Sequence, residues 1–463
     1  MKMNPPKLVI DEKEPFKDAL FGREEFAKSL TNLLRSVSEN LVVFVNAPWG
    51  EGKTTFSQMW RTHLKQQKLD VIYFDAYAAD YFEDPFVSFS GEILELVDKR
   101  LSEGKGLIER REFKETAIDV GKRLAGLATK IGLRAATLGA IEAAHVEELK
   151  KIGAEIASGV SEAGAHMVEK KLEDHGKEKK ALKKFKDSLT KLAAKVREEQ
   201  GFPLTIIVDE LDRCRPDFAL GLLERIKHLF DVEGVAFVLL VNRAQIESYI
   251  QTIYGSGDAG AYLLKFGSLF VDLPCQQQAS NSYQYVRGGN EYCNTLFDHY
   301  GLAKKVPDGR HLVNCTAIFA KHFDLSLREI EKVFAVMVIY YGSEFGNQRT
   351  FPFLIAMLSV LKIKRPSVYQ ALSKAALNPA QFFLEVNWNQ IDLSSGDNLS
   401  LEWATNVLDC CLMSDAEFES ATDDKNPKAR PDLGQMKTHF RRDRNRTIPS
   451  LCAQLDRFSL SPN

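Results

Sequence analysis

A phosphate-binding loop is the first chemistry that the residues suggest. Residues 41–55 read LVVFVNAPWGEGKTT, where a β-branched, apolar run meets a loop of small residues just before a helical pattern. A strand, a small-residue loop and a helix N-terminus in this order let backbone N–H groups converge on phosphate oxygens. The residues predicted to bind a nucleotide in this loop are Trp49, Gly50, Glu51, Gly52, Lys53, Thr54 and Thr55.

Two side chains of this loop have specific expected roles. Lys53 neutralises the outer phosphates, and the hydroxyl of Thr54 is a ligand for Mg²⁺. Ala47 stands where the usual pattern has its first glycine. Because Pro48 favours extended dihedrals at the preceding residue, Ala47 needs no glycine there. A chance GKT turn is the alternative, and the strand before it and the acidic motif below argue against it.

A second motif supplies carboxylates. Residues 204–216 read LTIIVDELDRCRP, in which an apolar strand ends in an acidic pair. Open α/β sheets place their chemistry at the carboxyl ends of their strands. Asp209 is therefore the candidate carboxylate for Mg²⁺, which it contacts through a bound water or from behind the direct ligands. Glu210 is the candidate residue that polarises the attacking water, and Asp212 is the next candidate for that role. A strand that ends in a solvated acidic turn is the alternative.

The elements that must position these residues alternate along the chain. Buried strands are expected at 41–46, 71–74, 204–208 and 235–241, with amphipathic helical patterns between and after them. This order predicts an α/β fold, a doubly wound parallel sheet of the P-loop NTPase type. Asn242 follows the last of these strands, where its side chain either orients the attacking water or serves as an ordinary turn residue.

Composition limits the class of protein. The 463 residues carry a net charge of −2, with 44% hydrophobic and 27% charged residues, which predicts a folded chain of about three domains. The seven cysteines form no CxxC pair, so neither a disulfide framework nor a zinc site is indicated. The N-terminal residues lack the apolar core of a signal peptide, and no run of about 18 uncharged apolar residues occurs. We expect a cytoplasmic protein without a transmembrane span, peripheral membrane contact being the minority alternative.

Seven segments of the chain resemble the KAP family of P-loop NTPases. They are KDALFGREEFAKSL, APWGEGKTT, YFDAYAADYFEDPF, VDELDRCRP, VAFVLLVNRAQIESYI, AYLLKFGSLFVDLP and LSLREIEKVF. The resemblance covers residues 17 to about 341, apart from much of the segment 105–200. It implies ATP rather than GTP and a link to bacterial antiphage defence. The family usually has a second aspartate where Glu210 stands and an aspartate where Asn242 stands.

The resemblance also carries over some single residues. Gly22 and Arg23 match a segment that packs near adenine, and Arg328 matches a lid position that points at the phosphates. A solvated helix arginine is the alternative for Arg328. Lys265 recurs in the family without a role that we can assign.

Arg213 and Arg215 follow the acidic motif directly. Either is a candidate arginine finger that completes the site of a neighbouring subunit. The alternative for each is an ordinary ion pair within the chain.

The expected domains are a P-loop core at 17–104 and 201–275, a helical insert at 105–200, a helical lid at 276–380 and a C-terminal region at 381–463. In the insert, charged residues interrupt every candidate membrane span. The insert is therefore expected to be a soluble helical arm that serves oligomerisation or a partner. The arginines at 441–446 and the lysines at 177–186 are interpreted as solvated or internally paired rather than as a nucleic-acid site.

Three functions follow from these residues. The leading one is an ATPase that couples hydrolysis to a change in its lid, its assembly or a partner. The alternatives are a nucleotide-gated scaffold with negligible turnover and a nucleic-acid motor. Because the chain shows no effector motif of its own, we expect a homo-oligomer that acts on a separate effector protein, with nucleic-acid binding left open.

Overall fold

The computed structural model divides into two compact units, residues 10–273 and residues 1–9 with 274–463. Residues 4–457 are described, apart from 7–8, 38, 70, 82–84, 101–106, 132–161, 275–281, 307, 343–350, 393–399, 424–425, 427–428, 431 and 435–440.

A five-stranded parallel sheet forms the centre of the first unit, with the strand order β2-β3-β4-β1-β5. The strands are β1 Leu41–Asn46, β2 Ile72–Asp75, β3 Leu204–Asp209, β4 Val235–Val241 and β5 Leu269–Asp272. The four expected strands are confirmed to within a residue. β5 was not predicted, because it has four residues and all of them are at least partly exposed.

The sheet order follows from burial. Every residue of β3 and β4 is buried, so these apolar strands occupy inner positions. The short strands β2 and β5 lie at the two edges. Because all the strands are parallel, their carboxyl ends meet at one edge, where Asn46 is opposite Val241 and Asp75 is opposite Asp209.

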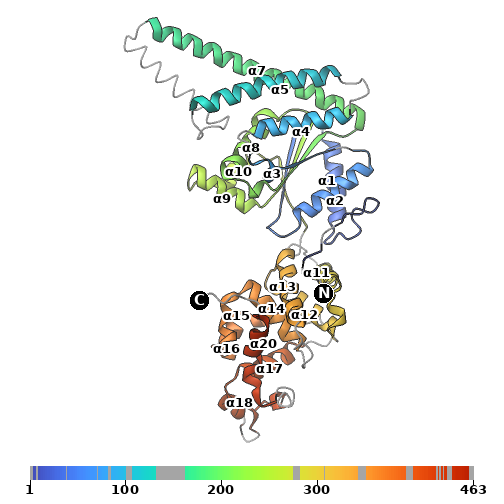
Figure 1. Ribbon diagram of the computed structural model, residues 1–463, viewed down its shortest axis with the longest axis vertical. Helices are drawn as coiled ribbons and strands as arrows, with labels where there is room; N and C mark the ends of the chain where they lie inside the picture. Colours follow the sequence, from blue (N-terminus) through green and yellow to red (C-terminus); the bar gives the residue numbers. More distant parts are fainter. Residues whose placement is uncertain are drawn as a thin grey trace. The chain divides into compact units, whose positions relative to one another are not determined.

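Helices cover both faces of this sheet (Figure 1). Residues of α1 and α2 pack with Val43, Val45 and Ile207 in one apolar cluster. Residues of α4, α8 and α9 pack with Val42, Phe44 and the opposite side of β3 in another. The helices of this unit are α1 Arg23–Ser36, α2 Lys53–Gln66, α3 Ala76–Ala79, α4 Pro85–Arg100, α5 Leu107–Ile131, α7 Glu162–Gln200, α8 Pro216–Leu229, α9 Arg243–Tyr254 and α10 Ala259–Leu263. The doubly wound α/β fold is thereby confirmed.

The insert begins and ends in two long helices, α5 and α7, that lie side by side (Figure 1). Its base is part of the main core, because Phe185 of α7 packs against Phe86, Phe113 and Phe230 at ring-centroid distances of 5.2–5.6 Å. Val120 of α5 is buried in the same core. The middle of the insert, residues 132–161, lies outside the described residues. No helix in the described part of the chain is both long and apolar enough to cross a bilayer.

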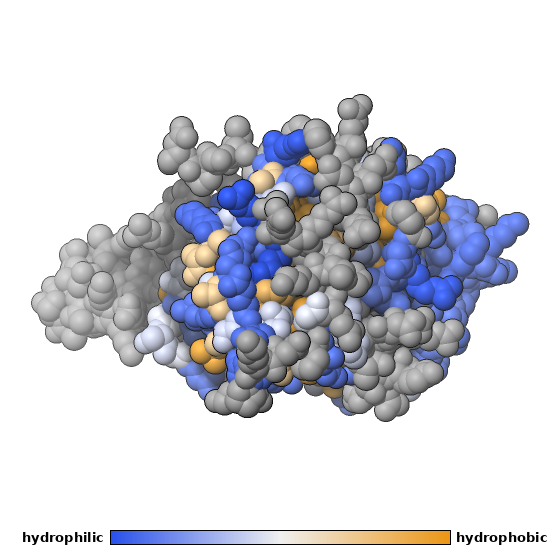
Figure 2. Space-filling model, turned by 90° about the horizontal axis from the view of Figure 1, so that it is seen from below, coloured by the Kyte–Doolittle hydropathy of each residue, from blue (hydrophilic) through white to orange (hydrophobic). Residues whose placement is uncertain are grey.

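The second unit is helical. Its α-helices are α11 Ser282–His299, α12 Gly309–His322, α13 Leu327–Gly342, α14 Pro352–Lys364, α15 Pro366–Ser373, α16 Pro379–Glu385, α17 Leu401–Leu412, α18 Asp415–Thr422 and α20 Thr447–Leu455. Lys362 of α14 donates to the Leu455 carbonyl and to Asp456, which ties α20 to the bundle. On the face drawn in Figure 2, the coloured side chains are mostly hydrophilic and the hydrophobic ones form small separate groups.

The C-terminal arginines are partly internal to this unit. Arg444 is buried, and it donates to the Cys410 and Met413 carbonyls and to Asp415. Its guanidinium also lies 4.2 Å from the ring centroid of Phe418. The expectation of internal pairing is therefore confirmed for this residue.

Candidate functional site

The phosphate loop joins the carboxyl end of β1 to the first residue of α2. Gly50 and Gly52 have φ angles of 89° and 74°, in the left-handed region that favours glycine. Helix α2 begins at Lys53, so its first backbone N–H groups face the loop, as anion binding at a helix N-terminus requires. A Cβ on Gly52 would also lie 3.0 Å from Nη1 of Arg23.

Arg23 supports this loop from the start of α1. It is 4% exposed, and its Nη2 donates to the backbone carbonyl of Glu51. Gly22 is the left-handed N-cap of the same helix. In the structure the Arg23 guanidinium contacts the backbone of the phosphate loop, and the expected position of Gly22 and Arg23 near adenine stays a prediction. The Glu51 side chain is fully buried, so at this position the backbone is what the loop offers to a ligand.

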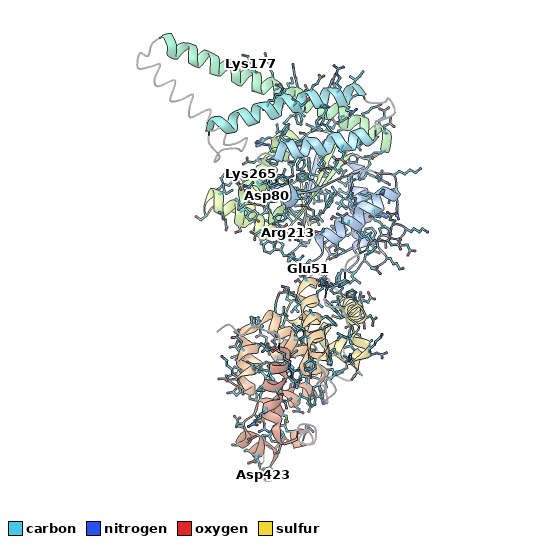
Figure 3. The ribbon with its side chains drawn as sticks, in the orientation of Figure 1. Glu51, Asp80, Lys177, Arg213, Lys265 and Asp423 are labelled. Atoms are coloured by element: carbon cyan, nitrogen blue, oxygen red, sulfur yellow. The ribbon has the colours of Figure 1, made fainter. Side chains whose placement is uncertain are left out.

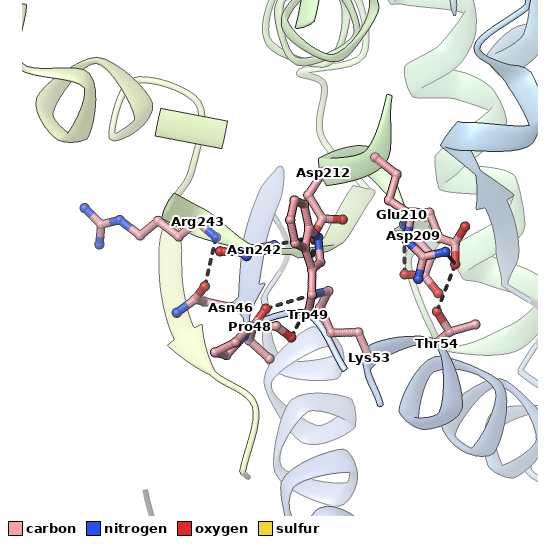
Figure 4. A network of polar contacts seen from close by, with 12 residues as sticks. Asn46, Pro48, Trp49, Lys53, Thr54, Asp209, Glu210, Asp212, Asn242 and Arg243 are labelled. Atoms are coloured by element: carbon pink, nitrogen blue, oxygen red, sulfur yellow. Dashed lines mark hydrogen bonds and ion pairs between the residues drawn. The ribbon is translucent and has the colours of Figure 1, made fainter. Parts of the chain in front are cut away.

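Lys53 and Asp212 form the centre of a polar network (Figure 4). The Lys53 ammonium donates to the Ala47 carbonyl at 2.8 Å and lies 3.2 Å from Oδ2 of Asp212. The same carboxylate oxygen accepts from Nε1 of Trp49 at 2.8 Å and from the backbone N–H of Asn242 at 2.9 Å. Asp212 is 1% exposed, so three donors satisfy a carboxylate oxygen that is out of water.

Asp209 and Thr54 lie together beside this network (Figure 4). The Asp209 carboxylate is fully buried and accepts from Ser57 Oγ at 3.2 Å, Tyr73 Oη at 3.0 Å and the Glu210 backbone N–H at 2.8 Å. Burial raises the pKa of Asp209, and hydrogen bonds from Thr54 and these donors oppose that rise. The pair presents a carboxylate and a hydroxyl, the hard oxygen ligands that Mg²⁺ prefers.

Glu210 is held in position by two neighbours. Its φ is 60°, which turns the chain sharply after β3. Arg213 Nη1 lies 2.9 Å from Oε1 of Glu210, and Thr54 Oγ1 donates to the same oxygen at 3.4 Å. Burial raises the pKa of Glu210, and the positive charge of Arg213 lowers it. This pair corresponds to the intrachain alternative for Arg213.

The end of β4 joins the network through its backbone. Asn242 donates its N–H to Asp212, and no hydrogen bond of its side chain occurs within the described residues. Asn46 at the end of β1 accepts from the Arg243 N–H at 2.9 Å and donates to Asp272 of β5 at 2.8 Å. The Asn242 position thus connects β4 to Asp212, while a role for its side chain in orienting water stays a prediction.

Three other candidates lie apart from this network. Arg215 pairs with Asp80, whose carboxylate accepts from its backbone N–H and Nε at 3.0 Å. Lys265 is exposed, and its Nζ lies 4.8 Å from the ring centroid of Tyr262. Arg328 is exposed on α13 of the second unit, so its expected lid role stays a prediction. Figure 3 shows Lys177 of the lysine-rich run on α7, away from Arg213 and Asp80.

Sequence reasoning missed several supporting residues. Ser57 lies one helical turn after Thr54, and Tyr73 lies one strand away, yet both contact Asp209. Asp212 was considered as a substitute for Glu210, whereas the structure places it on Lys53. Helical spacing was the available signal for Ser57. No local signal identifies these two contacts, because Tyr73 lies 136 residues from Asp209 and Asp212 lies 163 residues from Trp49.

The site combines the backbone N–H groups of the phosphate loop with the Lys53 ammonium and with the carboxylates of Asp209 and Glu210. Within the described residues, no group of three or more His, Cys, Asp or Glu side chains is arranged to hold a metal ion. Mg²⁺ usually binds through one or two protein oxygens together with substrate phosphates, so Thr54 and Asp209 are a fitting donor set.

A comparison with protein families identifies a P-loop domain in this chain. The family model for the KAP family P-loop domain matches residues 23–342. A solved structure of the Aeropyrum pernix ORC2 protein, in ADPNP and ADP complexes, is similar over 94% of this chain and 86% of that chain, with 14% identity and a TM-score of 0.33. A likeness at this TM-score carries no weight for the site or the function. No curated protein sequence matches the chain significantly.

Proposed function

The chain belongs to the KAP family of P-loop NTPases, and from this premise we propose that it is a Mg²⁺-dependent ATPase that drives a change of conformation or assembly. The observation that carries the proposal is the convergence of Lys53, Thr54, Asp209 and Glu210 at one edge of the sheet. Nucleotide binding follows from the family, whereas ATP as the substrate, Mg²⁺ and turnover are parts of the proposal.

Each residue has a distinct role in this reaction. Backbone N–H groups of residues 50–55 and the Lys53 ammonium bind the β- and γ-phosphates. Thr54 and Asp209 would hold Mg²⁺, which would neutralise charge that develops on the phosphates. Glu210 accepts a hydrogen bond from the attacking water and polarises it toward the γ-phosphorus. For this, Glu210 must exchange its contact with Arg213 for the water.

The test is phosphate release by the purified full-length chain with ATP or GTP, with and without Mg²⁺. We expect Glu210→Gln to bind ATP with unchanged affinity in calorimetry but to hydrolyse it at least 100-fold more slowly, since the amide keeps the shape and removes the charge. Glu115→Gln, an exposed ion-pair partner of Arg111 on α5, is the matched control and should retain parental activity.

The result also separates the alternatives. Hydrolysis by Glu210→Gln at the parental rate would show that another residue positions the water. ATP binding without turnover by the parent chain, alone and with DNA or RNA, would favour the nucleotide-gated scaffold. Stimulation by DNA or RNA would favour the nucleic-acid motor.

A separate effector and a role in antiphage defence complete the proposal, and the family resemblance supports them. If the defence role is correct, a strain that carries the chain and its neighbouring genes should resist phage, and Lys53→Ala should abolish that resistance. Equal plaque counts with the parent and with Lys53→Ala would contradict it.

A further inference from the structure

A cleft at the β2 edge of the sheet is separate from the nucleotide site. β2 is the last strand in the sheet order and pairs with β3. Val71 and Tyr73 pack on the α2 side of the sheet, and Ile72 and Phe74 pack on the α4 side. A cavity of about 360 Å³ is lined by residues of α2, β2 and α4, and it therefore lies between the two helices at the end of the sheet.

The two walls of this cleft carry opposite charges. Arg61 and Lys65 are one turn apart on α2, and Glu92 and Glu95 are one turn apart on α4. Within the described residues, none of these four side chains forms an ion pair. The Arg61 guanidinium lies 5.6 Å from the ring centroid of Tyr73, on the floor of the cleft. None of the four charges is held in an ion pair with a described residue. Burial raises the pKa of Glu92, and the charge of Arg61 across the cleft opposes that rise.

The edge of a strand offers unpaired backbone N–H and C=O groups to an added strand. Successive side chains of such a strand point to opposite faces of the sheet. An added strand beside β2 would therefore direct every second side chain toward Arg61 and Lys65 and the others toward Glu92 and Glu95. Four residues of β2 would pair with about 13 Å of an extended chain.

We propose that this cleft binds an extended peptide segment of a partner protein, in which acidic and basic side chains alternate. The acidic side chains contact Arg61 and Lys65, and the basic side chains contact Glu92 and Glu95. The backbone of the segment pairs with β2. Charge complementarity with both walls favours this occupant over a segment of a single charge.

The cleft is connected to the nucleotide site by one side chain. Tyr73 contacts Arg61 with its ring and donates its hydroxyl proton to Asp209 at 3.0 Å. An occupant that engages Arg61 and draws Tyr73 outward frees the Asp209 carboxylate for Mg²⁺. This second step rests on the proposed ATPase function, whereas peptide binding does not.

The binding test uses the full-length chain and a fluorescein-labelled octapeptide of four Glu-Lys repeats. A block peptide of four Glu followed by four Lys is the control, because it has the same composition but presents both charges to each wall. We expect fluorescence anisotropy to show at least tenfold tighter binding of the alternating peptide. Equal binding of the two peptides, or no binding of either, would overturn the proposal.

Charge reversal of the walls tests the location. The double variant Arg61→Glu with Lys65→Glu should weaken peptide binding at least tenfold. The double variant Arg61→Gln with Lys65→Gln, which only removes the two charges, should also weaken peptide binding and should disturb the local structure less. Adding Glu92→Lys and Glu95→Lys should restore binding, because a one-residue shift of register exchanges the two faces of a strand. Unchanged binding after reversal of one wall would place the peptide elsewhere. If the peptide fails to bind while reversal of one wall dissolves self-association in sedimentation, the occupant is a second copy of the chain and the proposal is wrong.

The connection is tested with Tyr73→Phe, which keeps the ring and removes the bond to Asp209. Saturation with the alternating peptide should lower the Mg²⁺ concentration needed for half-maximal ATP binding at least twofold in the parent and should have no effect in Tyr73→Phe. The same shift in both proteins would overturn the connection. Lys53→Ala should still bind the peptide, so a failure of the ATPase proposal is distinguishable from a failure of the cleft.

Discussion

At the scale of the residue, Asp212 is the meeting point of the phosphate loop and the end of β4. Its Oδ2 accepts from Trp49, Lys53 and the Asn242 backbone, and its carbonyl accepts from Tyr249. When a nucleotide draws Lys53 toward its phosphates, Asp212 loses the Lys53 ammonium. It then keeps only its neutral donors, the Trp49 ring N–H and the Asn242 backbone N–H. The loop and β4 are therefore coupled through one buried carboxylate.

This coupling makes Lys53→Ala informative in two ways. The variant should lose measurable ATP binding in calorimetry, since the cation that the loop aims at the phosphates is gone. It should also lose about 3–5 kcal/mol of stability, because Asp212 keeps a buried charge without its partner. Lys53→Ala with Asp212→Asn should recover stability in thermal denaturation and still not bind ATP. Unchanged ATP affinity in Lys53→Ala would refute the P-loop assignment.

The contact between Arg213 and Glu210 predicts how the rate of ATP hydrolysis depends on pH. Burial raises the pKa of Glu210, and Arg213 opposes that rise. A carboxylate that polarises water must be deprotonated, so the rate falls as the pH falls through this pKa. Arg213→Gln removes the opposing charge and should move the acid limb of the kcat/KM profile, which reports the free protein, to higher pH. The matched change Arg215→Gln, whose partner is Asp80, should leave that limb in place.

At the scale of the element, the base of the α5–α7 arm is part of the NTPase core. Phe185 of α7 contacts the rings of Phe86 on α4, Phe113 on α5 and Phe230, the residue that follows α8, and it is fully buried. The arm and the sheet are therefore expected to unfold together. A displacement of α7 would be transmitted to α8, which follows the acidic motif in the chain.

Phe185→Ala tests this packing. Truncation of a buried phenylalanine should cost about 3–5 kcal/mol, and the thermal midpoint should fall by about 2–4 °C for each kcal/mol. Lys184→Ala on the exposed side of α7 is the control and should shift the midpoint by no more than about 1–2 °C, because surface substitutions usually change stability by less than about 0.5 kcal/mol. A separate early transition of the arm, with the midpoint of the core unchanged, would contradict a shared core.

At the scale of the whole molecule, assembly remains a prediction. Arg213 and Arg215 both have partners within the chain, and their side chains are 40% and 56% exposed. An arginine that acts on a neighbouring subunit must exchange such a pair for the phosphates of that subunit. Activity then depends on association.

Specific ATPase activity should therefore rise with protein concentration if a finger acts between subunits. Replacement by Gln of whichever of Arg213 and Arg215 is the finger should remove that rise, and Asp217→Asn, which removes a second and exposed partner of Arg215, should preserve it. The measurement is phosphate release over a range of protein concentrations, together with light scattering in ATP and Mg²⁺. A monomeric chain whose specific activity is independent of concentration would count against the model.

The sequence by itself determined the elements whose information is local. The apolar runs of β1, β3 and β4, the GKT loop and the acidic pair after β3 each lie within about a dozen residues, so periodicity and motif spacing identify them. The tertiary structure decided the contacts between distant segments. Trp49 and Asp212, Tyr73 and Asp209, and Arg23 and the Glu51 carbonyl meet because sheet order and helix packing bring them together. Parallel strands gather their carboxyl ends at one edge, and which side chains then face one another depends on register and burial rather than on any short run of residues.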